Sequence, residues 1–210
     1  MDLFSQEGQE KEFEVLSLVD GEILFIKNFF NPSDSKYYYD ILQKTINWRQ
    51  EQVKVYGKIH SVPRKTAWYG EEGYNYSYSG INCYPEKWTK ELLEIKNKIE
   101  NVIPHSNFTS VLLNLYNNGN DKMGWHADDE KELGINPTIA SMSFGETRRF
   151  DIKHKEIKGL QYKFELTSGS LLIMRGALQH HWVHQIPIQK KVINPRINLT
   201  FRTIIKASNY

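Results

Sequence analysis

The residues best suited to chemistry in this chain begin with a histidine and an aspartate two positions apart. His126 and Asp128 lie in the segment GWHADDE. Because side chains alternate faces on an extended chain, residues i and i+2 point the same way, and one imidazole and one carboxylate can reach a common point. A second histidine from a later strand would complete a two-histidine, one-carboxylate triad. Such a triad leaves positions on Fe(II) open, as oxygenase chemistry requires.

The spacing alone leaves the third ligand open. The later segment QHHWVHQIP offers His180, His181 and His184. Alternation puts His180 and His184 on one face and His181 on the other, and periodicity does not choose between the first two. A His-x-Asp pair also occurs outside metal sites. Since Asp129 and Glu130 follow directly, a solvated acidic loop is the alternative interpretation.

Two arginines near the end of the chain could bind an anion. Arg196 and Arg202 are six residues apart in PRINLTFRT, so on a strand both would face the same side. Leu199 and Phe201 would then face the core. Buried arginines need a partner, and guanidinium groups bind carboxylates well. Either two internal salt bridges or a ligand with two carboxylates, such as 2-oxoglutarate, would satisfy them.

An α+β fold would position these residues. Asn31 followed by Pro32 predicts the start of a helix, and a second helix is expected after Pro85. The segment QVKVYGKIHSV predicts a hairpin with Gly57 near its tip. Short, often alternating segments then predict strands at 111–117, 139–145, 148–154, 160–166, 169–175 and 197–205. Two helices followed by many strands favour a β-sandwich or jelly-roll core.

Length and composition indicate one globular domain covering residues 1–210. No apolar run reaches membrane-spanning length, and the polar, acidic start does not resemble a signal peptide. The single cysteine, Cys83, excludes an internal disulfide and cysteine-based zinc sites. We therefore expect a monomer with no membrane partner, in the cytoplasm of a bacterium or the nucleus of a eukaryote.

The net charge of +2 is too small to indicate a polyanionic partner, but the charges are unevenly distributed. Residues 185–210 contain no Asp or Glu and several Lys and Arg, and residues 49–65 carry five basic residues against one Glu. Such stretches could contact phosphates. Solvated lysines on ordinary loops are the alternative.

Taken together, the motifs resemble the AlkB family of Fe(II)/2-oxoglutarate dioxygenases. The resemblance runs from about Val53 to Ile205 and rests on NLYNNG, GWHADDE, ASMSFGETRRF, SGSLLIMRG, WVHQIP and PRINLTFRT, in that order. It implies a double-stranded β-helix (jelly roll) core at 108–206, preceded by N-terminal helices and a nucleotide-recognition region at 50–85. Residues 1–20 are then expected to form a mobile N-terminus.

The resemblance implies a role for each matching position. His126, Asp128 and His184 match the Fe(II) ligands, with O2 and 2-oxoglutarate as co-substrates. Arg196, with Asn114 and Tyr116, matches the site of the distal carboxylate of 2-oxoglutarate. Arg202 matches the contact to the carboxylate nearest the metal, with Asn198 and Thr200 as auxiliaries. The positions that match substrate contacts are Val55, Tyr56 and Gly57 at the hairpin tip, Arg64 near the lesion strand, Tyr76 and Tyr78 in the base pocket, and Asp129 and Glu130 at the base edge.

The implied activity is oxidative removal of methyl groups from N-alkylated bases in DNA, such as 1-methyladenine and 3-methylcytosine. The segments QVKVYGKIHSVPRKTAWYG and YSYSGINCYP resemble the members that repair double-stranded DNA. Tyr56 stands where Phe is usual in those members, and Trp125 precedes the first ligand as in members that prefer single strands. Strand type therefore stays open. The alternatives are the same chemistry on RNA or single-stranded DNA, a non-catalytic nucleic-acid-binding jelly roll, and a dioxygenase acting on protein or small molecules.

Overall fold

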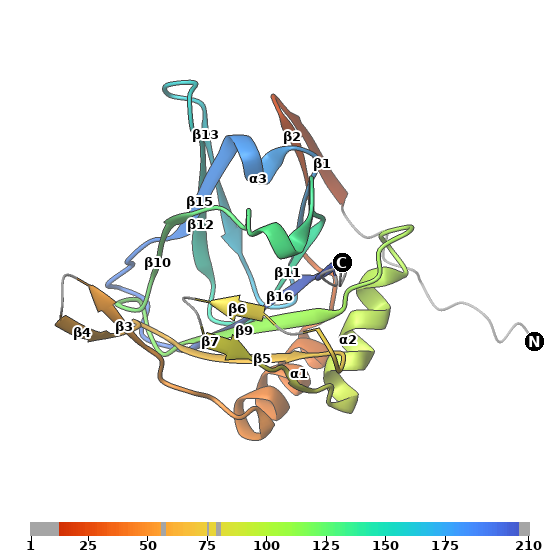
Figure 1. The fold of residues 1–210 in the computed structure, drawn as a ribbon, viewed down its shortest axis with the longest axis vertical. Helices are drawn as coiled ribbons and strands as arrows, with labels where there is room; N and C mark the ends of the chain where they lie inside the picture. Colours follow the sequence, from red (N-terminus) through yellow and green to blue (C-terminus); the bar gives the residue numbers. More distant parts are fainter. Residues whose placement is uncertain (1–12, 56–57, 75, 79–80, 206–210) are drawn as a thin grey trace, which may run out of the picture.

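Two β-sheets packed face to face form the centre of the molecule, and two helices cover the outer face of the larger sheet (Figure 1). The computed structural model describes residues 13–55, 58–74, 76–78 and 81–205. The helices are α1 (Pro32–Thr45), α2 (Lys90–Glu100), the 3-10 helix η1 (Lys131–Leu133) and α3 (Leu178–His181). The strands are β1 (Phe13–Leu18), β2 (Gly21–Ile26), β3 (Gln52–Val55), β4 (Lys58–Ser61), β5 (Lys65–Gly70), β6 (Tyr76–Tyr78), β7 (Ile81–Cys83), β8 (Glu86–Lys87), β9 (Ser110–Tyr116), β10 (Met123–His126), β11 (Ile139–Gly145), β12 (Arg148–His154), β13 (Gln161–Leu166), β14 (Leu171–Arg175), β15 (Trp182–Ile186) and β16 (Arg196–Arg202).

The sheet order places the first described strand at an edge of the larger sheet and the last near its middle. The larger sheet has the order β1-β2-β14-β11-β16-β9-β5-β8, and the smaller sheet has the order β10-β15-β12-β13. All pairs in both sheets are antiparallel except β5 with β8. The jelly-roll α+β core predicted from the sequence is confirmed. Strand β16 lies between β11 and β9 near the middle of the larger sheet.

Helices α1 and α2 begin at capping residues. The Asn31 side chain accepts a hydrogen bond from the backbone N–H of Asp34 (2.8 Å), and Pro32 occupies the first helical position. Helix α2 is capped in the same way by Thr89. The second helix therefore begins later than expected after Pro85, because the short strand β8 intervenes.

The two faces of the larger sheet have different environments. Apolar side chains of α1 and α2 pack on one face against alternate residues of the central strands, such as Leu113, Leu199 and Phe201. The opposite face packs against the smaller sheet, whose inward residues include Phe150 and Ile152. Because side chains alternate along a strand, the residues between those that contact the helices all point into the space between the sheets.

Most of the expected strands are present, with several local differences. β11 and β12 match their predicted ranges to the residue, and the β3–β4 hairpin forms, although its tip at 56–57 lies outside the described residues. Residues 13–18, expected in a mobile N-terminus, instead form β1, which pairs along its length with β2. Leu16 and Leu18 pack on the core between the sheets, an apolar pattern hidden by the acidic composition of this end. The strands β2, β5, β6, β7 and β8 were not predicted. No helix in the described part of the chain has the length and apolar content needed to cross a membrane.

We predict that Asn31→Ala lowers the free energy of unfolding by about 1 kcal/mol, because the first turn of α1 loses its side-chain cap. Urea denaturation followed by circular dichroism measures this change. Lys36→Ala on the same helix is the matched control, since Lys36 forms only an exposed ion pair with Asp40 (2.7 Å) and such pairs contribute about 0–1 kcal/mol. An Asn31→Ala variant no less stable than this control would contradict the capping role.

Candidate metal and co-substrate site

Three side chains bring nitrogen and oxygen donors together between the sheets. His126 ends β10 and lies directly opposite His184 of β15 in the antiparallel register. Their ring centroids are 4.2 Å apart, and Asp128 Oδ2 lies 3.8 Å from His184 Nε2. One donor atom from each residue lies within 4.8 Å of the others. One divalent cation can bridge such donors with small side-chain movements, and two imidazoles with one carboxylate are a donor set typical of Fe(II) oxygenases.

Hydrogen bonds hold two of these residues in a form that can bind a metal. Nδ1 of His126 lies 2.8 Å from the carbonyl oxygen of Gly124, which only accepts. Nδ1 therefore carries the proton and Nε2 presents its lone pair. The backbone N–H of Asp128 donates to Oε1 of Gln179 (2.9 Å), which fixes the segment just after β10. His184 packs against the ring of Phe150, with centroids 5.2 Å apart.

The protonation states also suit a metal. Burial raises the pKa of the Asp128 carboxyl, but the charge of Arg202, assisted by the two imidazoles, outweighs burial and holds this pKa below its usual value. Arg202 forms an ion pair with Asp128 from β16. Burial lowers the pKa of His184 to about 3. An anionic carboxylate and a neutral imidazole are the forms that coordinate metal ions.

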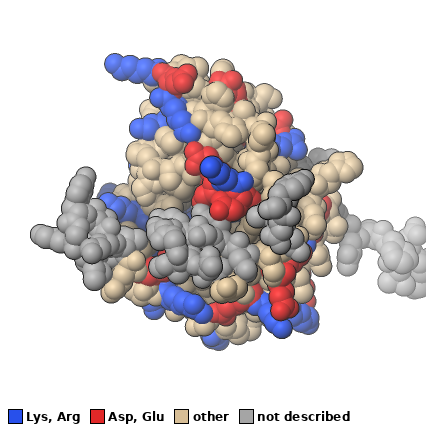
Figure 2. Space-filling model, viewed as in Figure 1, with Lys and Arg blue, Asp and Glu red and all other residues tan. Residues whose placement is uncertain are grey.

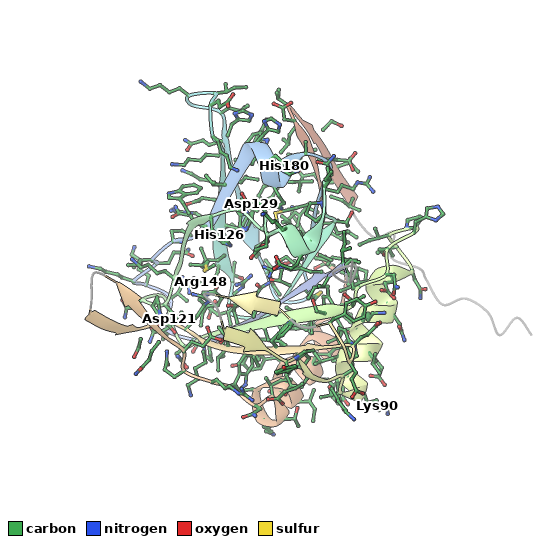
Figure 3. The ribbon with its side chains drawn as sticks, in the orientation of Figure 1. Lys90, Asp121, His126, Asp129, Arg148 and His180 are labelled. Atoms are coloured by element: carbon green, nitrogen blue, oxygen red, sulfur yellow. The ribbon has the colours of Figure 1, made fainter. Side chains whose placement is uncertain are left out.

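The structure brings His184 into this cluster and excludes His180. Residues 178–181 form the short helix α3, so the strand alternation used for the sequence prediction does not extend to His180. Nε2 of His180 accepts a long hydrogen bond from the backbone N–H of Asn136 (3.5 Å) instead. Figure 3 labels His126 and His180 apart, on β10 and α3.

A second group with the same donor types does not fit a metal. Asp20, His154 and His181 also place their donor atoms within 4.8 Å of one another. However, Nδ1 of His154 accepts hydrogen bonds from the backbone N–H groups of Glu156 (3.2 Å) and Ile157 (2.9 Å). A neutral imidazole carries its proton on the other nitrogen, so Nε2 must donate to Asp20 (3.3 Å) and has no lone pair for a cation.

The cavity next to the His126 cluster is lined by every residue that the sequence analysis assigned to metal or co-substrate. It lies on the inner face of the larger sheet, where alternate residues of β9 and β16 point toward the smaller sheet. The predicted residues that line it are Asn114, Tyr116, His126, Asp128, His184, Arg196, Asn198, Thr200 and Arg202.

Arg196 is a buried cation with unused hydrogen-bonding capacity. Its side chain is 1% exposed, and its Nη2 donates to Oγ of Ser143 (2.9 Å). Nε and Nη1 form no hydrogen bond with the described residues. Burial lowers the pKa of Arg196 to about 10, so the group stays charged at neutral pH. A buried guanidinium with free N–H groups at a cavity wall is suited to a carboxylate ligand.

Polar partners fix the remaining co-substrate candidates. Nδ2 of Asn198 donates to Oγ of Ser141 (2.9 Å), and the hydroxyl of Thr200 donates to Oδ1 of Asn198 (3.1 Å). Nε of Arg64 donates to Oδ1 of Asn114 (2.6 Å). Arg64, expected near the lesion strand, thus contacts a residue of the co-substrate cavity.

Asp129 and Glu130, expected at the base edge, do not line the cavity. Asp129 is exposed, with Oδ2 3.8 Å from Nζ of Lys155, and Glu130 occupies the N-cap position of η1 without a side-chain cap hydrogen bond. Tyr76 and Tyr78 belong to β6, which pairs with β7, and Val55 ends β3. Their side chains, with Tyr56 and Gly57, fall outside the described residues. The sequence analysis missed Ser141, Ser143 and Gln179, although the two serines alternate within an apolar strand, which is a usable signal.

Comparison with known proteins assigns this site to a class. The family described as the 2OG-Fe(II) oxygenase superfamily matches residues 22–202. The chain therefore belongs to the 2OG-Fe(II) oxygenase superfamily, whose cofactor and co-substrates are Fe(II), 2-oxoglutarate and O2.

Within this superfamily the chain is a member of the AlkB family, because curated relatives match it over most of its length. It is 41% identical to DNA oxidative demethylase ALKBH2 of Bos taurus, over 73% of this chain and 58% of the relative. It is 42% identical to the same-named protein of Mus musculus, over 73% and 67%. It is 42% identical to alpha-ketoglutarate-dependent dioxygenase alkB homolog 3 of Bos taurus, over 79% and 60%. The chain thus spans about three fifths to two thirds of these relatives.

A solved structure shares the fold. The structure of OsALKBH1 matches with a TM-score of 0.55 over 90% of this chain and 100% of that chain. The sequence identity of 18% limits this comparison to the architecture.

We predict that His184→Ala lowers the affinity for Mn(II), used in place of iron, by at least about tenfold, because one ligand is lost. Isothermal titration calorimetry on untagged protein measures the affinity. His180→Ala and His181→Ala are matched controls from the same segment and should bind Mn(II) like the parent chain. Loss of binding in the His180→Ala variant, with His184→Ala unaffected, would overturn the ligand assignment.

Proposed function

We propose that this chain removes methyl groups from N-alkylated bases in DNA by Fe(II)- and 2-oxoglutarate-dependent oxidation. The observation that carries the proposal is the convergence of His126, Asp128 and His184 beside a cavity that also contains Arg196 and Arg202. The names of relatives about 40% identical to the chain, DNA oxidative demethylase among them, support DNA as the substrate.

His126, Asp128 and His184 would hold Fe(II), and the iron with 2-oxoglutarate and O2 supplies the oxidising power for removal of the methyl carbon. The protein residues keep the ligands in their metal-binding forms. Gly124 fixes the tautomer of His126, and Arg202 keeps the Asp128 carboxylate anionic. Burial of Asp128 and His184, at 3% and 4% exposure, limits the access of water to this side of the site.

The two arginines would bind opposite ends of 2-oxoglutarate. Two nitrogens of Arg196, Nε and Nη1, have no hydrogen-bond partner among the described residues, and Asn114 and Tyr116 lie on the neighbouring strand β9. Arg202 lies at the metal end, because it already contacts Asp128. Arg196 would therefore hold one carboxylate of the diacid, and Arg202 would hold the other beside the metal ligands.

The substrate base would enter from the face of the molecule that carries the candidate substrate-contact residues. A methylated base inside a duplex cannot reach the cavity, so the nucleotide must be flipped out at a cost of a few kcal/mol. We assign base stacking to Tyr76 and Tyr78, base-edge contacts to Asp129 and Glu130, and duplex entry to the β3–β4 tip at Val55, Tyr56 and Gly57. On the face seen in Figure 2, a group of Asp and Glu side chains with Lys or Arg atoms directly over it lies near the centre, and side chains of both charges are scattered toward the edges.

The proposal also covers the division of the chain into functional regions, its oligomeric state and its cellular compartment. We assign residues 108–206 to the catalytic core and 50–85 to nucleotide recognition, within one domain. β5 from the second range pairs with β9 of the core, so the two ranges share one sheet. We further propose a monomer that acts in the cytoplasm of a bacterium or the nucleus of a eukaryote.

We predict that the chain, with Fe(II), 2-oxoglutarate and O2, converts 1-methyladenine and 3-methylcytosine oligonucleotides to the unmodified form. Mass spectrometry detects the loss of one methylene, and Asp128→Ala should abolish it. The panel contains single-stranded DNA, duplex DNA and RNA, so the preferred strand type is read from the same experiment. Succinate release without a mass change on any oligonucleotide would contradict the proposed substrate and favour a dioxygenase acting on another molecule.

We also predict that Arg196→Met raises the dissociation constant for 2-oxoglutarate at least about tenfold, because a buried carboxylate loses its charged partner. Calorimetric titration into the Mn(II)-loaded chain gives the constant. Mn(II) affinity should not change, since Arg196 does not contact the three ligands. An unchanged affinity for 2-oxoglutarate would remove Arg196 from the site.

A further inference from the structure

A second buried arginine lies behind the co-substrate cavity without lining it. Arg148 is the first residue of β12, and its side chain is 1% exposed. The mechanism above does not use it. A buried charge requires several hydrogen bonds to compensate for lost hydration, so the partners of Arg148 indicate what it stabilises. Figure 3 labels Arg148 between Asp121 and His126 in the view.

Arg148 binds two loops at once. Its Nη1 donates to the carbonyl oxygen of Asn118 (3.1 Å), and Nη2 donates to that of Asp121 (2.8 Å). From the other loop it reaches the carbonyl oxygen of Pro187 (Nη2, 2.8 Å) and Oε1 of Gln189 (Nε, 3.2 Å). One guanidinium thus supplies four hydrogen bonds to backbone and amide oxygens that all lie in loops.

Each of these two loops connects a strand that carries a candidate metal ligand to a strand that carries a candidate co-substrate residue. The first joins β9, which carries Tyr116, to β10, which carries His126. The second joins β15, which carries His184, to β16, which carries Arg196. The loops also contact each other directly through hydrogen bonds between residues 119 and 189 and between 119 and 192, each 2.8 Å long. A Cβ at Gly119 would lie 1.8 Å from the carbonyl oxygen of Gln189, so no other residue fits there.

Arg148 also packs against Tyr116, which lines the co-substrate end of the cavity. Its Cζ lies 5.5 Å from the centre of the Tyr116 ring, and the Cζ of Arg196 lies 5.4 Å from the same ring. Tyr116 is therefore in contact with two guanidinium groups. Cations over an aromatic face are attracted to it, so Arg148 restrains the ring that lies beside Arg196.

We propose that Arg148 is a positioning residue for 2-oxoglutarate, which it aligns through Tyr116 and through the two loops that set the distance between Arg196 and the metal ligands. This inference rests on the proposed function, since it assumes that Arg196 and Tyr116 bind the co-substrate. Arg148 does not itself contact the cavity. Its effect should therefore fall on co-substrate binding rather than on the metal or the substrate base.

The test compares Arg148→Lys with the parent chain, because lysine keeps the charge but cannot make four directed hydrogen bonds. We expect the dissociation constant for 2-oxoglutarate, measured calorimetrically in the untagged Mn(II)-loaded chain, to rise about tenfold, as is typical when partners of binding groups are removed. KM for 2-oxoglutarate should rise in parallel while kcat, KM for the oligonucleotide and Mn(II) affinity stay near the parent values. Arg149→Lys is the matched control, since Arg149 pairs with Asp151 outside the cavity (2.8 Å).

The outcomes separate this inference from the proposed function. If the parent chain binds no 2-oxoglutarate, the proposed function itself fails. If the parent binds it and a folded Arg148→Lys variant binds it equally well, only the role of Arg148 is overturned. A lower kcat with both KM values unchanged and a lower melting temperature would also overturn it, because that pattern indicates loss of folded enzyme. Should Arg148→Lys not fold, Gln189→Ala removes one partner of the same guanidinium and should raise the 2-oxoglutarate constant without changing Mn(II) affinity.

Discussion

The site depends on one buried ion pair that joins the two sheets. Asp128 follows β10 of the smaller sheet, and Arg202 ends β16 in the larger one. A carboxylate that is 3% exposed would normally be protonated to avoid the cost of burying a charge. Arg202 reverses this balance and keeps the group anionic. The same contact sets the position of Asp128 relative to the cavity, so charge state and geometry have a common cause.

Strand β16 contributes to both the core and the site because its residues alternate between two faces. Ile197, Leu199 and Phe201 pack under the helices, while Arg196, Asn198, Thr200 and Arg202 line the cavity. A shift of one residue against β9 or β11 would exchange these sets and bury the arginines under the helices. The apolar residues therefore fix the register that places the polar residues. This coupling explains why the stability of the sheet and the arrangement of the cavity cannot be varied independently on this strand.

The sequence was sufficient for features set by local pattern and insufficient for those set by distant contacts. Alternation predicted β11 and β12 to the residue and placed Arg196 and Arg202 on one face of β16. It could not choose between His180 and His184, because the four-residue helix α3 has too few residues to show a period. It also missed Gln179 and Ser143, whose partners Asp128 and Arg196 are 51 and 53 residues away. These contacts form only after the chain folds: the alternation of Ser141 and Ser143 in β11 indicates inward polar positions but does not identify their partners.

The two groups of one aspartate and two histidines show why donor type and proximity do not define a metal site. In both groups the donors lie within 4.8 Å. The two groups differ in the hydrogen-bond partner of the histidine Nδ1 atom. A carbonyl oxygen next to Nδ1 of His126 requires a proton there and leaves Nε2 free to coordinate. Two backbone N–H groups next to Nδ1 of His154 require the reverse tautomer, and its Nε2 proton is directed at Asp20. The backbone of each strand end therefore decides whether its histidine is a ligand or a structural hydrogen-bond donor.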